Sequence, residues 1–202
     1  MTRDVVVVGT SVANIASVLA ALRRAGARPA VSLDPVEVDR ATHVVLPGVG
    51  AFGAAMDAIT RAGLAEVIAG RASAGRPLLA ICLGLQLLAE GSDESPGVRG
   101  LGVVPGIARR YGSAVRVPQL GWNRVQPVAD ARVINPGWAY FANSYRIESI
   151  PPGWSGATAE YGGPFVAALE RRAVVACQFH PEVSGAWGAA LIRRWLETEA
   201  AW

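Results

Sequence analysis

The chain has 202 residues, of which 51% are hydrophobic and 17% charged, and its formal net charge is +3. This length predicts a single domain, residues 1–202, with a core of its own, and the composition excludes a disordered chain. Every basic residue is Arg, and the basic pairs are scattered without interleaved aromatic residues, so the sequence predicts no nucleic-acid partner.

Cysteine content and apolar run length bear on where the protein works. Two cysteines, Cys82 and Cys177, are too few for a disulfide framework, which favours a reducing compartment and a cytoplasmic location. Cys177 lies in the apolar run of residues 174–179 and is predicted to be a core residue. No apolar run approaches the roughly 18 residues of a membrane-spanning helix, so no membrane association is predicted.

Short apolar runs alternate with helical patterns through the first half of the chain. The expected strands are residues 5–8, 29–33, 43–46 and 77–82. The expected helices are residues 14–26, 52–62, 64–74 and 85–90, and a turn begins at Asp34 and Pro35. This alternation is typical of a parallel sheet that helices cover on both faces.

The pattern changes after Gly91. Strand-like runs separated by turns with Gly and Pro occupy residues 103–109, 122–125, 139–142, 165–170 and 174–179. Residues 187–199 are expected to form a closing helix with Trp187, Leu191 and Trp195 on one face. The sequence therefore predicts an α/β fold. Its mostly parallel central sheet is flanked by helices in a flavodoxin-like, three-layer arrangement, with additional mixed or antiparallel strands in the C-terminal half.

Cys82 lies where a buried strand is predicted to turn sharply into a helix. Free backbone N–H groups and the positive end of that helix would then face its sulfur and favour the thiolate form. The same layout occurs in nucleophile elbows, where a small residue two positions later, here Gly84, lets the helix pack close to the strand. Cys82 is therefore a candidate nucleophile, and the alternative is a buried structural cysteine.

A thiol nucleophile needs a base, and His180 is one of only two histidines. Like Cys82, it follows an apolar strand, and sites in parallel α/β sheets gather at the carboxyl ends of strands. Glu182, two residues on, would face the same way in an extended segment and orient the imidazole. These residues predict a Cys–His–Glu triad, with a simple turn after a strand as the alternative for His180. His43 has no partner motif and is predicted to be a strand-edge residue.

The segment Pro47-Gly48-Val49-Gly50 follows the third expected strand. Its two glycines allow backbone conformations that expose N–H groups, as anion-binding nests do. The donors predicted to stabilise a tetrahedral intermediate are the N–H of Val49 or Gly50 and that of Leu83. A phosphate-binding loop is the competing interpretation, but neither GxGxxG nor GxxxxGK[ST] occurs and the chain has no Lys.

These motifs resemble those of the class I, triad-type glutamine amidotransferases. Residues 81–86 (ICLGLQ) and 179–182 (FHPE) carry the resemblance, in the family's order and separation. Within the class, the chain is similar to the glutaminase subunits of imidazole glycerol phosphate synthases, of histidine biosynthesis. Residues 46–53 (LPGVGAFG), 117–123 (VPQLGWN) and 140–146 (YFANSYR) carry that closer likeness, which covers nearly the whole chain.

The resemblance implies a glutaminase mechanism. Cys82 would attack the side-chain amide of glutamine, His180 would transfer the proton that releases ammonia, and Glu182 would orient His180. The residues it implies around the bound glutamine are Gly48, Gly50, Gln86, Asn143 and Ser144. The implied partner, in a heterodimer, is a barrel-shaped cyclase subunit that receives the ammonia, and no metal ion or organic cofactor is expected.

Several residues depart from the family pattern without touching the triad. Residues 9–14 (GTSVAN) keep only the final Asn14 of the usual loop, and Val183 replaces a usual Lys. Gln119 and Asn143 stand where His is common. Several of these positions lie on the face that the resemblance assigns to the partner. Three alternatives follow: a diverged amidotransferase serving a different synthase, a free-standing Cys hydrolase, and a catalytically silent module that binds and regulates a synthase.

Overall fold

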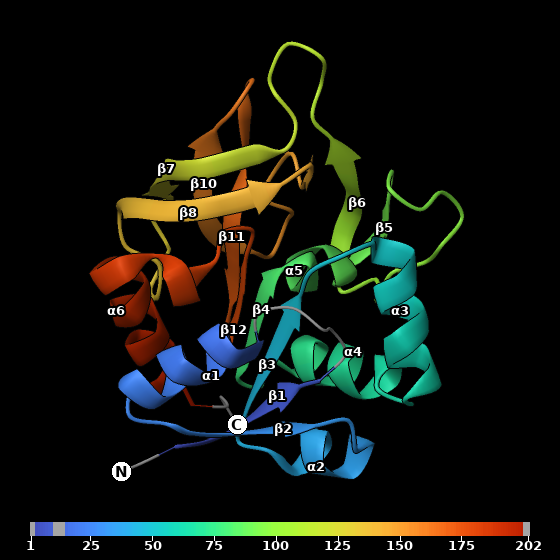
Figure 1. The fold of residues 1–202 in the computed structure, drawn as a ribbon, viewed down its shortest axis with the longest axis vertical. Helices are drawn as coiled ribbons and strands as arrows, with labels where there is room; N and C mark the ends of the chain where they lie inside the picture. Colours follow the sequence, from blue (N-terminus) through green and yellow to red (C-terminus); the bar gives the residue numbers. More distant parts are fainter. Residues whose placement is uncertain (1–2, 10–14, 200–202) are drawn as a thin grey trace.

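Helices and strands alternate through the first half of the computed structural model, which describes residues 3–9 and 15–199 (Figure 1). The strands of this half are β1 (Asp4–Val8), β2 (Arg28–Ser32), β3 (His43–Gly48) and β4 (Leu78–Cys82). The helices are α1 (Ile15–Arg24), α2 (Pro35–Arg40), α3 (Phe52–Arg61), α4 (Ala65–Ala74) and α5 (Leu83–Leu87). Residues 10–14, most of the segment that departs from the family pattern, lie outside the described residues.

The second half is mostly strands. They are β5 (Ala89–Ser92), β6 (Val104–Arg110), β7 (Gln119–Pro127), β8 (Gly137–Asn143), β9 (Tyr145–Arg146), β10 (Ser155–Glu160), β11 (Pro164–Arg171) and β12 (Val174–Cys177). A single 3₁₀ turn, η1 (Pro181–Val183), leads into the last described helix, α6 (Gly185–Leu196). None of the helices formed by described residues has the length and apolar character needed to span a membrane.

Nine strands form one sheet in the order β2-β1-β3-β4-β12-β11-β10-β7-β8. The first five are parallel, and every pair from β12 onward along that order is antiparallel. A smaller sheet has the order β5-β6-β9. The predicted fold class is therefore confirmed, including the antiparallel strands of the C-terminal half.

Two apolar cores lie on the two faces of the sheet. One core includes Val18 and Leu22 of α1 with Leu191 and Trp195 of α6. The other receives buried apolar residues of α2, α3, α4 and α5, so these helices cover the opposite face (Figure 1). Because β3 and β4 are covered on both sides, all their residues are buried, which is why these strands read as continuous apolar runs.

The parallel register brings three chain segments to one edge of the sheet. Gly48, the last residue of β3, is paired with Cys82, the last residue of β4. On the other side of β4, Cys177 of β12 is paired with Ile81. The residues that follow β3, β4 and β12 therefore meet at the carboxyl ends of adjacent strands, where α/β sheets place their sites.

The predicted helix at residues 85–90 is wrong in its extent. Helix α5 ends at Leu87, and residues 89–92 form strand β5. The backbone N–H groups of Leu101 and Gly102 bond to the carbonyls of Leu87 and Ala89, at 2.8 and 3.0 Å. A distant segment thus takes the carbonyl groups that a longer helix would have used.

The cysteine and the histidine that the sequence leaves outside the triad, Cys177 and His43, both occupy buried positions. Cys177 is fully buried in β12, as predicted. His43 begins β3, in the interior of the sheet, and its ring contacts that of Trp195 edge-on at 5.1 Å between centroids. Burial, with a further effect of Arg3, lowers the pKa of His43 to about 4, so this imidazole is neutral at physiological pH.

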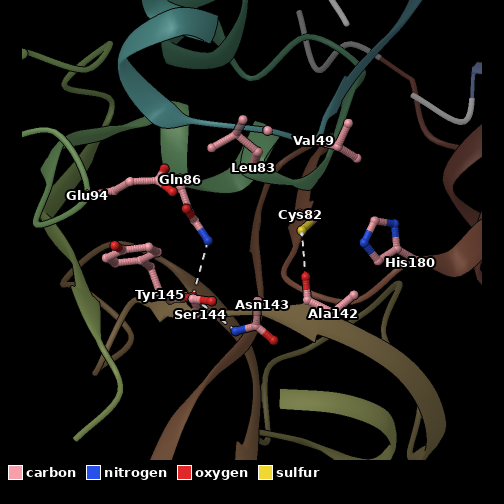
Figure 2. Close-up of a pocket in the computed structure, with 11 residues that line it drawn as sticks. Val49, Cys82, Leu83, Gln86, Glu94, Ala142, Asn143, Ser144, Tyr145 and His180 are labelled. Carbon is pink, nitrogen blue, oxygen red and sulfur yellow. Dashed lines mark hydrogen bonds between the residues drawn. The ribbon is translucent and has the colours of Figure 1, made fainter. Parts of the chain in front are cut away.

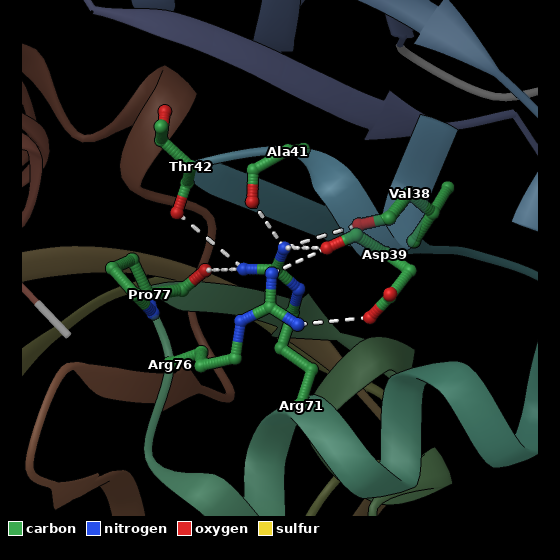
Figure 3. Close-up of polar contacts among 7 residues, drawn as sticks. All are labelled: Val38, Asp39, Ala41, Thr42, Arg71, Arg76 and Pro77. Carbon is green, nitrogen blue, oxygen red and sulfur yellow. Dashed lines mark hydrogen bonds and ion pairs between the residues drawn. The ribbon is translucent and has the colours of Figure 1, made fainter. Parts of the chain in front are cut away.

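Arg71 is a buried cation that holds the C-terminal end of α2 (Figure 3). The carbonyl oxygens that accept hydrogen bonds from its guanidinium are those of Val38, Asp39, Ala41, Thr42 and Pro77. Burial lowers its pKa to about 10, assisted by Arg76 and opposed by Asp39, so Arg71 stays charged at neutral pH. The side chain therefore supplies donors to helix-end carbonyls that have no partner within α2.

Replacing Arg71 with Met is expected to lower the free energy of unfolding by about 2–4 kcal/mol, because several buried carbonyls lose their donor. Urea denaturation followed by circular dichroism measures this loss. The control is Arg61→Met, since Arg61 is exposed and pairs only with Asp57 four residues earlier; its cost is expected to stay within about 0.5 kcal/mol. Equal costs for the two variants would contradict the role given to Arg71.

Candidate active site

Cys82 lies at a strained turn between strand β4 and helix α5. Its φ is 54° and its ψ is −108°, a conformation that non-glycine residues rarely adopt and that costs about 1–3 kcal/mol. Helix α5 has only five residues, so the local N–H groups matter more here than a helix dipole. The thiol is 7% exposed at this turn, which matches the predicted elbow geometry.

Two glycines permit the close packing around that turn. A Cβ on Gly84 would lie 2.2 Å from the carbonyl oxygen of Leu46 in β3. A Cβ on Gly48 would lie 2.7 Å from the backbone nitrogen of Gly84. Both positions therefore exclude any larger residue, and the elbow is held directly against strand β3.

His180 and Glu182 follow strand β12 as a hydrogen-bonded pair. The Nδ1 atom of His180 lies 2.8 Å from Oε1 of Glu182. Residues 181–183 form a 3₁₀ turn and not the extended segment that the sequence suggested, so the pair meets by a different local route. The backbone N–H of His180 donates to the carbonyl of Tyr140 at 2.9 Å, which fixes the base against strand β8.

The charge state of His180 follows from its neighbours. Burial alone lowers the pKa of this imidazole, but hydrogen bonds and charge interactions with Cys82 and Glu182 outweigh burial and raise it to about 10. The ring is therefore protonated at neutral pH and stands beside the Cys82 sulfur. Glu182 is 7% exposed, so its carboxylate acts in a medium that screens it weakly.

Cys82 and His180 open on one cavity of about 320 Å³. Figure 2 shows the two side chains next to each other at one end, with Glu94 and Tyr145 at the other. The residues that line this cavity are Val49, Gly50, Cys82, Leu83, Gln86, Glu94, Ala142, Asn143, Ser144, Tyr145 and His180. A volume of this size is at the lower end for small-molecule sites.

Most of the predicted substrate and oxyanion residues lie around this cavity, but Gly48 does not. Gly48 packs beneath it against Leu83 and Gly84, so its contribution is close packing and not contact with a ligand. Gly50 has a φ of 94°, a left-handed conformation that favours glycine at the cavity wall. Val49 and Leu83 line the wall as well, on either side of the Cys82 turn.

Glu94, Tyr145 and Ala142 were missed by the sequence analysis. Glu94 is the only acidic residue among those lining the cavity. Its Oε2 accepts a hydrogen bond of 2.7 Å from the N–H of Phe52, at the start of α3, and so caps that helix from a distant loop. Asp93 and Glu94 make this loop acidic, but the sequence holds no signal that the loop folds back over the site.

The departures at Gln119 and Asn143 are joined by the Tyr111 hydroxyl. Nδ2 of Asn143 donates to that hydroxyl at 3.0 Å, and the hydroxyl donates to Oε1 of Gln119 at 2.9 Å. Burial raises the pKa of Tyr111 well above its ordinary value, so the hydroxyl keeps its proton. Nδ2 also donates to the carbonyl of Tyr145 at 2.9 Å, so the amide is rigidly oriented at the cavity wall.

The chain was compared with known protein families, curated proteins and solved structures. A family model described as "Glutamine amidotransferase class-I" matches residues 12–197. "Imidazole glycerol phosphate synthase subunit HisH" of Symbiobacterium thermophilum is 41% identical over 195 residues, covering 95% of this chain and 92% of that protein. The same-named subunit of a Thermus thermophilus strain is 44% identical over 188 residues, covering 91% of this chain and 93% of that protein.

A longer relative and a solved structure extend the comparison. "Imidazole glycerol phosphate synthase hisHF, chloroplastic" of Arabidopsis thaliana is 40% identical over 192 residues, which cover 91% of this chain and 32% of that protein. A structure titled "Crystal structure of glutamine amidotransferase" superposes with a TM-score of 0.77 at 19% identity, covering 96% of this chain and 97% of the other. On the family match and these relatives, the chain belongs to the class-I glutamine amidotransferases.

Proposed function

We propose that this chain is the glutaminase subunit of an imidazole glycerol phosphate synthase, and that it hydrolyses glutamine and passes ammonia to a cyclase partner in histidine biosynthesis. The observation that carries the proposal is the Cys82 elbow opening on the same cavity as the His180–Glu182 pair. The names of its relatives support the choice of synthase. In this proposal, residues 1–202 form one domain, and a cytoplasmic location stays a prediction from the two thiols.

The reaction proceeds through a thioester. The Cys82 sulfur attacks the side-chain carbonyl carbon of glutamine, and the resulting tetrahedral intermediate collapses with cleavage of the C–N bond. His180, which holds a proton at neutral pH, gives it to the departing nitrogen, so the nitrogen leaves as ammonia. Water, with His180 now acting as base, then attacks the thioester and releases glutamate and the Cys82 sulfur. Glu182 keeps the ring oriented through both steps.

Backbone donors stabilise the negative charge that develops on the carbonyl oxygen. The N–H of Leu83 lies at the start of α5, directly after the nucleophile, as in other elbows. The second donor is the N–H of Val49 or Gly50, which line the same cavity. Each such donor is worth about 10²–10³ in rate.

Polar groups away from the triad fit the amino-acid end of glutamine. Glu94 supplies the only carboxylate in the cavity lining and is suited to the α-ammonium group. Gln86, Asn143 and Ser144 line the same cavity and complete the proposed substrate contacts. No metal ion or organic cofactor takes part in the proposed reaction.

Glu94→Gln is expected to raise KM for glutamine by about 10–100-fold with little change in kcat. The Glu94 carboxylate attracts the substrate and the transition state equally, so its removal weakens binding and does not slow the bound substrate's reaction. The Gln side chain keeps an oxygen for the N–H of Phe52, so the start of α3 stays capped. Steady-state kinetics with the activating partner present separate the two constants. A fall in kcat at unchanged KM would reject the assignment.

An exposed apolar face next to the cavity fits the partner. Leu120 and Trp122 of β7 are cross-strand neighbours of Ala142 and Tyr140 of β8, so the four side chains share one face of the sheet. Leu120 and Trp122 are 64% and 56% exposed, and Trp138 on the same face is 58% exposed. Exposed aromatic residues in such a cluster are typical of a protein interface.

A second cavity supports the transfer of ammonia towards that face. Its volume is about 500 Å³, and its lining is Val49, Tyr140, Ala142, His180 and Val183. Val49, Ala142 and His180 also line the glutamine cavity, so the two spaces adjoin at His180. In the proposed complex, a barrel-shaped cyclase subunit covers this apolar space and receives ammonia without exposure to water. Val183, where the family resemblance leads one to expect Lys, contributes an uncharged side chain to this lining.

The test is glutamate release from glutamine, measured with the chain alone and with the cyclase subunit of an imidazole glycerol phosphate synthase added. We expect the cyclase to raise the rate by about 5–150-fold, the usual range for coupled sites. Equal activity with and without cyclase would favour a free-standing hydrolase, and activation by a different synthase would favour a diverged amidotransferase. No activity under any condition, with Cys82 unreactive, would favour a regulatory binding module.

A further inference from the structure

Gln178 is a buried amide that the proposed reaction leaves without a role. It lies between Cys177 and Phe179, just after strand β12, and its side chain is fully buried. Its backbone N–H donates to the carbonyl of Ala167 at 2.8 Å, which anchors it to β11. Gln178 does not line the glutamine cavity, yet its Nε2 lies 3.6 Å from the sulfur of Cys82.

The direction of each hydrogen bond around Gln178 is fixed by its neighbours. The carbonyl oxygen of Tyr145 can only accept, so Gln86 must turn its Nε2 towards it, at 3.1 Å. The same Nε2 donates to Oε1 of Gln178 at 3.0 Å. Gln178 must therefore present its Nε2, a donor, to the Cys82 sulfur.

Besides its contact with the His180 imidazole, the Cys82 sulfur has two polar contacts of opposite character. Towards the carbonyl of Ala142, at 3.9 Å, the thiol donates its proton. Towards Nε2 of Gln178, the sulfur accepts. The first contact favours the neutral thiol, while an N–H donor favours the anion. The balance between the two contacts thus affects how readily the sulfur loses its proton.

We propose that Gln178 is a further catalytic residue, which stabilises the Cys82 thiolate by donating an N–H hydrogen bond to the sulfur from a buried position outside the cavity lining. Gln86 is the positioning residue of this pair, because its bond to Tyr145 fixes the orientation of the Gln178 amide. The inference rests on the proposed nucleophilic role of Cys82. It adds a buried donor to the imidazolium and backbone groups already described.

The test measures the rate of Cys82 alkylation by iodoacetamide as a function of pH. All variants carry Cys177→Ala, so that only one thiol is present. Gln178→Met keeps the length of the side chain and removes the donor, and is expected to move the pH midpoint of alkylation upward by about one unit. Gln178→Glu keeps an oxygen for Gln86 but turns the other towards the sulfur, so a larger upward movement is expected.

The relative size of the midpoint shifts in Gln178→Glu and Gln178→Met distinguishes a hydrogen-bond donor from a residue that only packs. Glu preserves the shape of Gln better than Met does, so a purely structural residue would give the smaller effect with Glu. The double variant Gln86→Met/Gln178→Met is expected to have the same alkylation midpoint as Gln178→Met alone, because Gln86 acts through Gln178. The exposed Gln126→Met is the control and keeps the parent midpoint.

Unchanged midpoints in folded Gln178 variants would overturn the proposal. A second measurement needs no Gln178 substitution: in the unmodified chain, the side-chain amide protons of Gln178 are expected to shift in NMR spectra as Cys82 titrates, and not in Cys82→Ser. No shift in that titration would equally overturn it. Alkylation uses neither glutamine nor cyclase, so it tests Gln178 independently of the proposed function. If the variants shift the alkylation midpoint as expected but the unmodified chain does not hydrolyse glutamine, the result counts against the proposed function and not against the role of Gln178.

Discussion

Replacing Cys82 with Ser is expected to reduce glutamine hydrolysis in the presence of the partner by about 10⁴-fold or more. A hydroxyl in the same position is not ionised beside the His180 imidazolium and is a much weaker nucleophile. The turn itself is unchanged, because Ser accepts the same backbone conformation as Cys. Glutamate release in the coupled assay measures the loss, and circular dichroism checks the fold.

The matched control for this variant is Cys177→Ala, which removes the other thiol. Cys177 is fully buried in the apolar core at β12, and its sulfur makes a polar contact with the carbonyl of Ala80, at 3.6 Å. Burial raises the pKa of this thiol well above its usual value, so it does not form the thiolate. Its loss is expected to leave the rate within about threefold. Comparable losses for both variants, or a Cys82→Ser variant with a tenth of the normal rate, would remove Cys82 from the mechanism.

Glu182→Gln is expected to slow glutamine hydrolysis by about 10³–10⁴-fold, because the imidazole loses both its orientation and its negative partner. The carboxylate is one of the two groups that raise the pKa of His180 to about 10. With a neutral amide in its place, the pKa of His180 moves down towards its ordinary value near 6.5. The imidazole ¹⁵N signals of His180, followed by NMR through a pH titration, measure that movement directly.

The raised pKa of His180 also makes the free energy of unfolding depend on pH, with lower stability at higher pH. His180 has a higher pKa in the folded chain, about 10, than the ordinary 6.5 of an unfolded chain. Folding therefore gains stability from protonated His180 in full below about pH 6.5, and loses that gain as the pH rises towards 10. Wild type is expected to lose more unfolding free energy than Glu182→Gln between pH 6.5 and 10. Parallel losses, with His180 titrating near 6.5 in both, would contradict the charged pair.

The local sequence pattern was sufficient to predict the central strands of the sheet because these strands are buried on both faces. Strands β3 and β4 read as unbroken apolar runs for that reason. Strand β10 was missed because its sequence, SGATAE, has little strand character and pairs through its neighbours β11 and β7. The sequence predicts only a turn where α2 forms, because a helix of six residues shows too little periodicity, although Asp34 caps it and Pro35 begins it.

Some site residues can likewise be predicted from the local sequence pattern, whereas others reach the site only through contacts between distant segments of the chain. Cys82, His180 and Glu182 sit at strand ends that the chain pattern reveals, so the sequence could predict their convergence. Glu94 reaches the cavity only because its loop folds back onto the start of α3, through its bond to Phe52. Gln178 is close in sequence to His180, but its contact with the Cys82 sulfur depends on the pairing of β12 with β4.

The central claim is that the Cys82 sulfur attacks glutamine in the cavity it shares with His180. The most direct measurement is covalent labelling with a chloroketone analogue of glutamine, with the partner cyclase present and the modified peptide located by mass spectrometry. We expect one label, on Cys82 and not on Cys177; glutamine should protect against this labelling, and Glu94→Gln should slow it. Label on Cys177, or a Cys82 that stays unmodified while glutamine is being hydrolysed, would contradict it.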